Sequence, residues 1–246
     1  MPTSVRESPA PGIPTRVEDS APEVPRFAIR LPVLLSVIAG MVDLTGFYTL
    51  GDIFTAHITG NLVVAAALVV RGGPVHLAQL LAIPVFMLAL AVVWSIARVS
   101  GRRGVPLARL LLLMQFVLLA AVLIFCIITK PSTNPHGATA GVAVMLAVSA
   151  MAVQYALLRL AMPGAISTAV MTGNLTNAVL SLMDSLPKRD PLMTADRDKL
   201  KRSVQLLLGF LIGCVIAAAA VSLLADWAWL LPAGLAAVAV VLRIDM

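Results

Sequence analysis

The sequence predicts an all-α, polytopic transmembrane helix bundle built from two repeated halves. Apolar residues make up 60% of the 246-residue chain and charged residues only 12%, whereas about a quarter of the residues of soluble globular proteins are charged. Several apolar runs reach the roughly 20 residues that a helix needs to cross a bilayer core. A nine-residue pattern also occurs twice, at 54–62 and 167–175, with six identical positions at a spacing of 113. We therefore expect one half to be a copy of the other.

The chain divides into a tail and one membrane domain. Residues 1–29 are expected to be disordered, because six prolines and seven charged side chains, three arginines and four acids, leave no sustained apolar period. This tail is not expected to be a secretory signal, since the apolar run from Phe27 is too long and lacks a small-x-small cleavage site. The transmembrane domain is expected at 30–246, with halves at about 31–129 and 138–243 separated by a proline-containing turn.

Four apolar runs per half predict about eight spans in total. An even number of spans per half gives both halves the same orientation, which is the arrangement of parallel repeats. Both termini and the polar stretch 184–202 are then expected in the cytoplasm, with twelve basic residues from Arg16 onward inside and five outside. The basic residues Arg98, Arg102, Arg103 and Arg109 are forced outward by this count, so six or seven spans are alternatives.

The basic residues lie at the ends of apolar runs, which indicates cytoplasmic loops rather than a nucleic-acid surface, despite the net charge of +6. Cys126 and Cys214 lie inside apolar runs and suggest neither a disulfide nor a metal site. The chain contains no H-E-x-x-H, P-loop, G-x-G-x-x-G or G-x-S-x-G motif. We expect no catalytic residues, no metal and no cofactor, and hence no enzyme.

Asp43 is the first candidate for a functional site. A carboxylate inside a span costs about 2.5–3.5 kcal/mol on insertion scales unless it is protonated, paired or facing a cavity. Gln154 stands at the equivalent position of the second half when 40–43 is aligned with 151–154. Asp43 is therefore either a titratable site residue, with Gln154 as its hydrogen-bonding counterpart, or a structural residue near an interface or paired with Arg159.

The repeated T-G-N pattern supplies the other candidates. A helix through it places Ala56 and Gly60, and likewise Ala169 and Gly173, four residues apart, which is small-xxx-small packing spacing. Thr59 and Thr172 are expected to bond to carbonyls of the preceding turn. Asn61 and Asn174 have more donors and acceptors than a tight apolar joint satisfies, so they either bond to each other near a pseudo-axis or line a polar cavity. His57, four residues before Asn61, has no counterpart in the second copy and is either a packing residue or a proton relay.

Together these segments resemble the YoaK family of bacterial multi-pass membrane proteins, a family with a domain of unknown function. The resemblance rests on Gly40–Asp43 with the aromatic and glycine that follow, on F-T-A-H-I-T-G-N, and on Gln154 with M-T-G-N-L-T-N. It covers nearly all of residues 31–243. The resemblance implies a bacterial inner-membrane protein and no particular substrate.

Two functions follow from these observations. The first is a small-molecule or ion transporter or permease with Asp43, His57, Asn61, Gln154 and Asn174 lining the site, because internal repeats with polar residues at membrane depth build transporter sites. The second is a non-transporting membrane scaffold or partner subunit, whose T-G-N helices serve packing or homo-oligomer formation. The expected partners are the lipid bilayer and a small solute or ion, and no nucleic acid.

Overall fold

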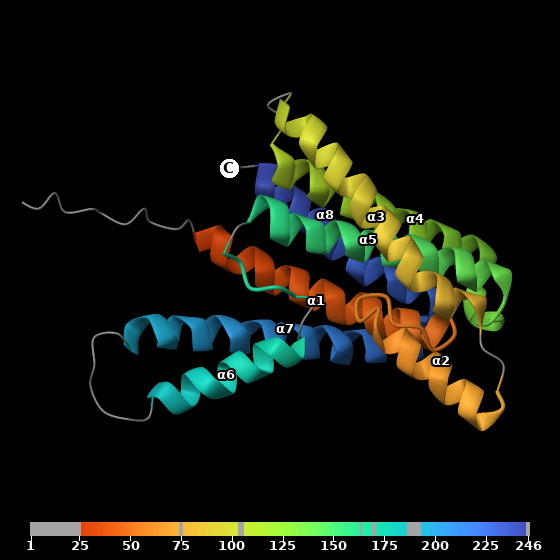
Figure 1. The fold of residues 1–246 in the computed structure, drawn as a ribbon. Helices are drawn as coiled ribbons and strands as arrows, with labels where there is room; N and C mark the ends of the chain where they lie inside the picture. Colours follow the sequence, from red (N-terminus) through yellow and green to blue (C-terminus); the bar gives the residue numbers. More distant parts are fainter. Residues whose placement is uncertain are drawn as a thin grey trace, which may run out of the picture.

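The computed structural model describes residues 26–73, 76–102, 106–162, 164–168, 171–185 and 193–244. These residues form an all-α bundle and contain no strand (Figure 1). The helices are α1 (Arg26–Thr49), α2 (Gly60–Arg71), α3 (Leu77–Arg102), α4 (Leu107–Thr129), α5 (Ala138–Ala161), α6 (Met171–Ser185), α7 (Met193–Leu224) and α8 (Leu230–Ile244), with 3-10 helices η1 (Pro131–Thr133) and η2 (Ala225–Trp229).

Two segments are more helical than expected. Helix α1 starts at Arg26, so the last four residues of the predicted tail 1–29 are helical, and the remainder of the tail lies outside the described residues. Helix α7 starts at Met193 and is 32 residues long, so the second part of the predicted loop 184–202 extends a membrane helix. At about 1.5 Å per residue this helix is about 48 Å long, well above the bilayer core of about 30 Å.

Five helical stretches of the described residues are long and apolar enough to cross a membrane. They are Leu31–Thr49, Leu77–Gly101, Leu107–Thr129, Ala138–Ala161 and Arg197–Leu242, the last of which contains α7, η2 and α8. The two helices that carry T-G-N are shorter. Helix α2 has 12 residues and α6 has 15, which is about 18 and 22 Å and too short for a full crossing. The expectation that each T-G-N run forms a span of its own is therefore wrong.

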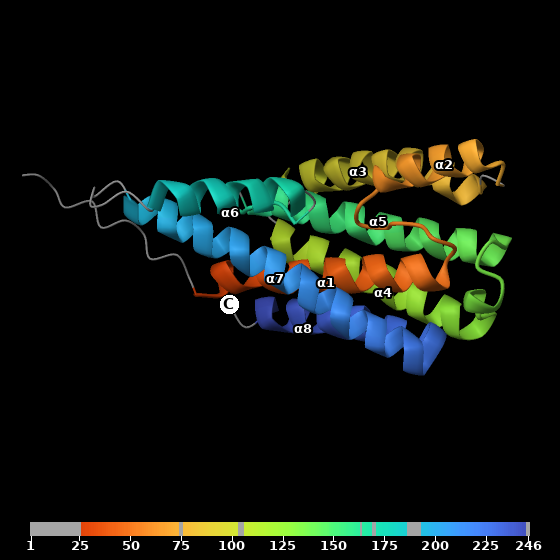
Figure 2. The same cartoon turned by 90° about the horizontal axis from the view of Figure 1, so that it is seen from below.

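Both short helices begin inside the bundle, after a break in the preceding helix. The first break occurs at Gly51 and Asp52, which have φ angles of +87° and +56° and reverse the chain direction. Residues 53–59 then run back in non-helical conformation beside α1, and α2 starts at Gly60. Figure 2 shows this loop crossing between α1 and the α2–α3 pair. In the second half a similar break contains Gly164, with φ of +90°, between α5 and α6.

The corresponding helices α1 and α5 run antiparallel. The Leu35 carbonyl accepts a hydrogen bond from the Gln154 side chain near the end of α5 (3.0 Å). Beyond the other end of α1, Gly51 packs against His136, which precedes α5. The colour order of the two helices in Figures 1 and 2 shows the same directions. The parallel orientation predicted for the two halves is therefore wrong.

The pattern of helix contacts is also the same when each helix is replaced by its counterpart in the other half. Helix α1 packs against α7, and its counterpart α5 packs against α3; α4 and α8 pack against each other. Ser36 donates to the Leu206 carbonyl (2.6 Å), and the Trp229 indole donates to the Thr49 hydroxyl (3.3 Å). These contacts join the middle of α1 to the middle of α7, and the end of α1 to the end of η2, which follows α7, so α1 and α7 are parallel.

Close backbone approach occurs where α1 crosses α7, on glycines other than those of T-G-N. A Cβ atom on Gly40 would land on the Phe210 carbonyl oxygen, and one on Gly213 would land on the Val37 carbonyl oxygen. A Cβ on Gly209, four residues before Gly213, would lie 3.2 Å from the Val33 carbonyl oxygen. This is small-xxx-small packing in α7. In contrast, a Cβ on Gly60 would meet only the ring of Phe54 in its own loop.

This crossing predicts that Gly213→Ala destabilises the protein by about 1–3 kcal/mol, the usual cost of overpacking a close contact. Gly234→Ala in α8 is the matched control, because nothing lies within 4 Å of a Cβ at that position and alanine favours helices over glycine by about 1 kcal/mol. Unfolding of the detergent-solubilised variants measures both effects. Equal stability of the two variants would contradict the assigned crossing.

Candidate functional site

Asp43 on α1 holds the loop 53–59 in place. Its Oδ1 accepts hydrogen bonds from the backbone N–H groups of Thr55 (2.7 Å), Ala56 (2.8 Å) and His57 (3.4 Å). The residue is only 4% exposed. Backbone amides that are away from water need a partner, and here a carboxylate supplies it. Asp43 therefore fixes the loop that leads into α2.

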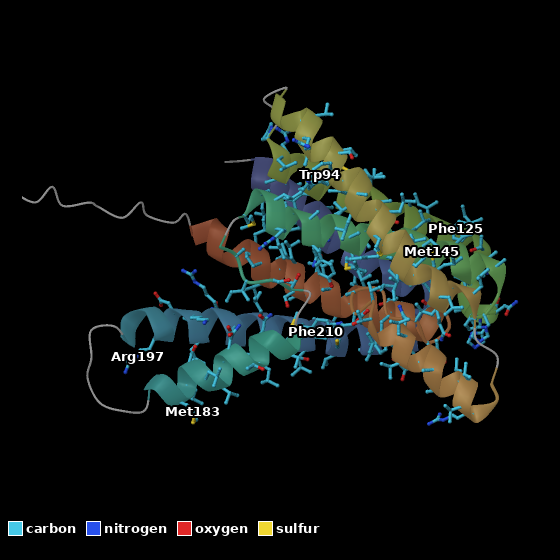
Figure 3. All side chains as sticks on the ribbon, in the orientation of Figure 1. Trp94, Phe125, Met145, Met183, Arg197 and Phe210 are labelled. Atoms are coloured by element: carbon cyan, nitrogen blue, oxygen red, sulfur yellow. The ribbon has the colours of Figure 1, made fainter. Side chains whose placement is uncertain are left out.

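His57 is the side-chain partner of Asp43. Its Nδ1 lies 2.6 Å from Asp43 Oδ2; an ionised carboxylate only accepts, so with Asp43 in that form Nδ1 is the donor of this bond. The ring packs edge-on against Phe210 of α7, with centroids 5.1 Å apart; Figure 3 shows Phe210 midway along the molecule. The suggested pairing of Asp43 with Arg159 is wrong: Arg159 is exposed, and the ion pair of Asp43 within the described residues is to His57.

Asn61 in the first turn of α2 closes the same loop. It is fully buried, its Oδ1 accepts from the Phe54 N–H (2.8 Å), and its Nδ2 donates to the Phe54 carbonyl (2.8 Å). Asn174 repeats this contact in the second half, because its Nδ2 donates to the Ser167 carbonyl (2.8 Å), again seven residues earlier. The two asparagines therefore serve their own loops, and the bond expected between them is absent from the described residues.

Gln154 takes the place of Asp43 in the second half. Its Nε2 donates to the Thr168 hydroxyl (3.2 Å), in the loop before α6, and to the Leu35 carbonyl of α1. Its Oε1 accepts from Nε2 of Gln115 on α4 (2.7 Å). Thr168 corresponds to Thr55, whose backbone is held by Asp43. Equivalent positions of the two halves thus hold the two loops, with a carboxylate in one half and an amide in the other.

The two loops are joined through α5. Tyr155, next to Gln154, donates its hydroxyl hydrogen bond to the Ala56 carbonyl in the first loop (2.8 Å). The four chain segments that meet here are α1, α5 and the two loops, and α4 reaches them through Gln115. Gln115 and Tyr155 were not identified from the sequence. A buried glutamine in the middle of the apolar run 107–129 was the available signal for Gln115.

The predicted packing residues have other roles. Residues 53–59 are not helical, so Ala56 and Gly60 do not share a helix face; Ala56 is buried in the loop, and Thr59 is the N-cap of α2 without a side-chain capping bond. In the second copy, Thr172 is an exposed residue of α6 whose carbonyl accepts from Thr176 (3.0 Å). Gly173 is half-buried in the same helix, and Ala169 lies outside the described residues.

A second polar cluster closes the end of the bundle that is remote from the start of α1 and the end of α8. Asp226 of η2 accepts from the Ser132 hydroxyl (2.5 Å) and backbone N–H (3.2 Å). The rings of His76 and His136 are stacked, with centroids 3.9 Å apart. Burial lowers the pKa of His76, and the positive charge of His136 lowers it further, while Asp52 opposes the shift. Both histidines border an apolar cavity of about 330 Å³ between α3 and α5, which Ile53 also lines.

The comparisons with known proteins show the family. A family model described as "Protein of unknown function (DUF1275)" matches residues 31–242. The chain belongs to the DUF1275 family. The YoaK-like proteins that the sequence resembles are part of DUF1275. No curated protein and no solved structure matched this chain.

For this DUF1275 protein, the loop contacts predict that Asn61→Ala destabilises the fold by roughly 1–3 kcal/mol, because it leaves the buried Phe54 N–H and carbonyl without partners. Asn61→Asp should be no better, since a second carboxylate oxygen would face the Phe54 carbonyl. Asn177→Ala is the control, because the Asn177 side chain has no hydrogen bond among the described residues. Thermal melting in detergent separates the three. If the Asn61→Ala variant has the same melting temperature as the control, the hydrogen bonds between Asn61 and Phe54 have no structural role.

Proposed function

We propose that this DUF1275 protein is a small-molecule or ion permease whose site lies at the two loops, with Asp43, His57, Asn61, Gln154 and Asn174 around it. The supporting observation is that α2 and α6 both begin inside the bundle, each after a non-helical loop held by buried polar side chains. Non-helical backbone at membrane depth is tolerated where protein buries it or where it lines a cavity. Broken helices of this kind form the substrate and ion sites of many secondary transporters.

The proposed topology follows from the helix lengths and directions. Helices α1, α3, α4, α5 and α7 cross the membrane. Helix α8 has only 15 residues, like α6, and crosses together with the 5 residues of η2 that directly precede it, which bring the segment to the roughly 20 residues of a crossing. Helices α2 and α6 are re-entrant half-helices on opposite sides. Each half then has three crossings, an odd number, so the halves are inverted-topology repeats. This arrangement agrees with the antiparallel directions of α1 and α5.

The proposed orientation rests on the basic residues. Of the described basic residues only Arg71 and Lys130 lie at the end formed by the connections α2–α3 and α4–α5. Those at the opposite end, where α1 starts and α8 ends, include Arg98, Arg109, Arg159, Arg197, Lys199, Lys201 and Arg202. Figure 3 labels Arg197 there. By the positive-inside rule this end is cytoplasmic. The bacterial inner membrane as the location is carried over from the resemblance to the YoaK family. The Arg98–Arg109 region, which eight spans would have placed outside, then lies inside.

A non-transporting scaffold is the second candidate. It is favoured by the internal use of Asn61, whose Oδ1 and Nδ2 both bond to Phe54. These two bonds hold the loop in place, and this role requires no path for a solute. In either role the proposal contains no catalytic step.

The topology predicts opposite labelling of two exposed arginines in a background with Cys126 and Cys214 replaced by alanine. A membrane-impermeant thiol reagent added to intact cells should label Arg71→Cys, and it should label Arg109→Cys only after the membrane is permeabilised. Eight full spans predict the reverse for both positions. Fusion reporters after residue 188 and at Met246 should both report the cytoplasm. The reversed labelling pattern would exclude the re-entrant α2.

The permease predicts a water path to the loop. In the same background, His57→Cys should react with a charged thiol reagent, because the permease opens the site to water. Val117→Cys on α4 is the control, since Val117 is an exposed apolar residue in the middle of a membrane helix and should react only with a lipophilic reagent. If His57→Cys, like Val117→Cys, does not react with the charged reagent from either side of the membrane, the permease proposal is wrong and the scaffold function is favoured.

A further inference from the structure

Asp43 has little capacity left to bind a solute or an ion. Its Oδ1 accepts from three backbone N–H groups, and its Oδ2 bonds to Nδ1 of His57. A carboxylate has about four acceptor sites, and all four bonds here come from the loop 53–59. With 4% of its surface exposed, Asp43 is better suited to hold another group than to exchange with water.

His57 has the free nitrogen of the pair. Its side chain is 31% exposed, against 5% for that of Asp43. Nδ1 is used on Asp43, whereas Nε2 has no hydrogen-bond partner among the described residues. Since Nδ1 carries a hydrogen, the neutral ring presents Nε2 as a bare lone pair, which is the atom that accepts a proton.

The groups around His57 suit an imidazolium ion. Helix α1 contributes the Asp43 carboxylate, and α5 contributes Tyr155, whose hydroxyl is directed to the Ala56 carbonyl. Helix α7 contributes the Phe210 ring, which forms a T-shaped contact with the imidazole, and Cys214, whose thiol is directed to the Gly40 carbonyl (3.5 Å). No lysine or arginine forms an ion pair with Asp43 among the described residues. An imidazolium formed by protonation of Nε2 is therefore paired through Nδ1 with the Asp43 carboxylate, and no lysine or arginine of the described residues competes for that carboxylate.

We propose that His57, rather than Asp43, is the proton-carrying group of this protein, and that Asp43 is its positioning residue; this rests on the proposed permease function. A proton from water on one side forms an N–H bond at Nε2, and the Asp43 carboxylate compensates the charge of the imidazolium. Breaking the same N–H bond releases the proton to water on the other side. Because the loop amides and the imidazole share one carboxylate, the charge of His57 is coupled to the position of the loop and hence of α2.

The experiment uses the fact that the chain has only three histidines. Replacing His76 and His136 with glutamine leaves His57 as the single imidazole, and histidine-selective ¹⁵N NMR then reports its tautomer and protonation. We expect the Nδ1–H tautomer in the neutral ring and reversible protonation of Nε2 when the pH of the sample is lowered. In Asp43→Asn the protonation should be weaker, because a neutral amide no longer stabilises the imidazolium. The Nε2–H tautomer, or no protonation of Nε2 while the protein stays folded, would overturn the proposal.

A second measurement separates a proton carrier from a histidine that merely packs. Proteoliposomes of the same variant on a solid-supported membrane should give a charge displacement after a pH jump, since the proton binds inside the membrane field. His57→Gln should reduce this signal at least tenfold. The His57→Gln variant keeps the three backbone N–H groups that donate to Asp43, and its melting temperature shows whether the fold is retained. The Asp43→Asn variant also retains an acceptor for the loop, and its charge displacement should appear only at lower pH. This variant tests the proposal if His57→Gln does not fold.

The two proposals fail differently. If the charge displacement is unchanged in His57→Gln, proton carriage by His57 is wrong, and a His57→Cys variant that still reacts with a charged reagent leaves the permease function in place. If His57→Cys is also unreactive from both sides, both proposals fail.

Discussion

The bonds from Asp43 to the amides of residues 55–57 are the interaction on which the arrangement of this bundle depends. A non-helical segment inside an apolar bundle needs a partner for each of its backbone groups. Asp43 supplies acceptors for three N–H groups, Asn61 bonds to both groups of Phe54, and Tyr155 binds the Ala56 carbonyl. The carbonyls of residues 57–59 accept from the first turn of α2. With these bonds made, α2 can start inside the bundle.

The second half reaches the same geometry with neutral groups. Gln154 holds Thr168 as Asp43 holds Thr55, and the i−7 bond of Asn174 to Ser167 matches that of Asn61 to Phe54. The difference lies in charge, since only the first loop has a carboxylate and an imidazole. A buried network of amides responds little to pH, whereas a carboxylate–imidazole pair changes its charge when a proton binds. The repeat therefore gives two similar loops, of which one has a titratable pair.

The breaks after α1 and α5 also change the end of the bundle to which the basic residues are assigned. If each T-G-N run were a full span, the basic residues near Arg98 and Arg109 would lie on the side of the membrane opposite to the termini. With α2 and α6 as half-helices, these residues lie at the end that also contains Arg159 and the start of α7. Closure of the opposite end is provided by contacts between connections, namely Asp226 with Ser132 and His76 with His136. The long apolar helices and the polar ends thus form one consistent arrangement.

The sequence by itself determined the all-α character with helices apolar and long enough to cross a membrane, the family and the repeated nine-residue pattern, and it singled out Asp43, His57, Asn61, Gln154 and Asn174 as candidate site residues. It did so because apolar length, composition and rare polar residues at membrane depth are local properties of the chain. Their partners were decided only by the tertiary structure. The T-G-N pattern reads equally well as a small-residue helix face or as a loop followed by a helix, because Asn61 reaches Phe54 only after the chain has reversed at Gly51 and Asp52. The antiparallel halves, the close α1–α7 crossing at Gly40 and Gly213, and the choice of His57 over Arg159 as partner of Asp43 all depend on contacts between residues 14 to 180 positions apart, which no local pattern specifies.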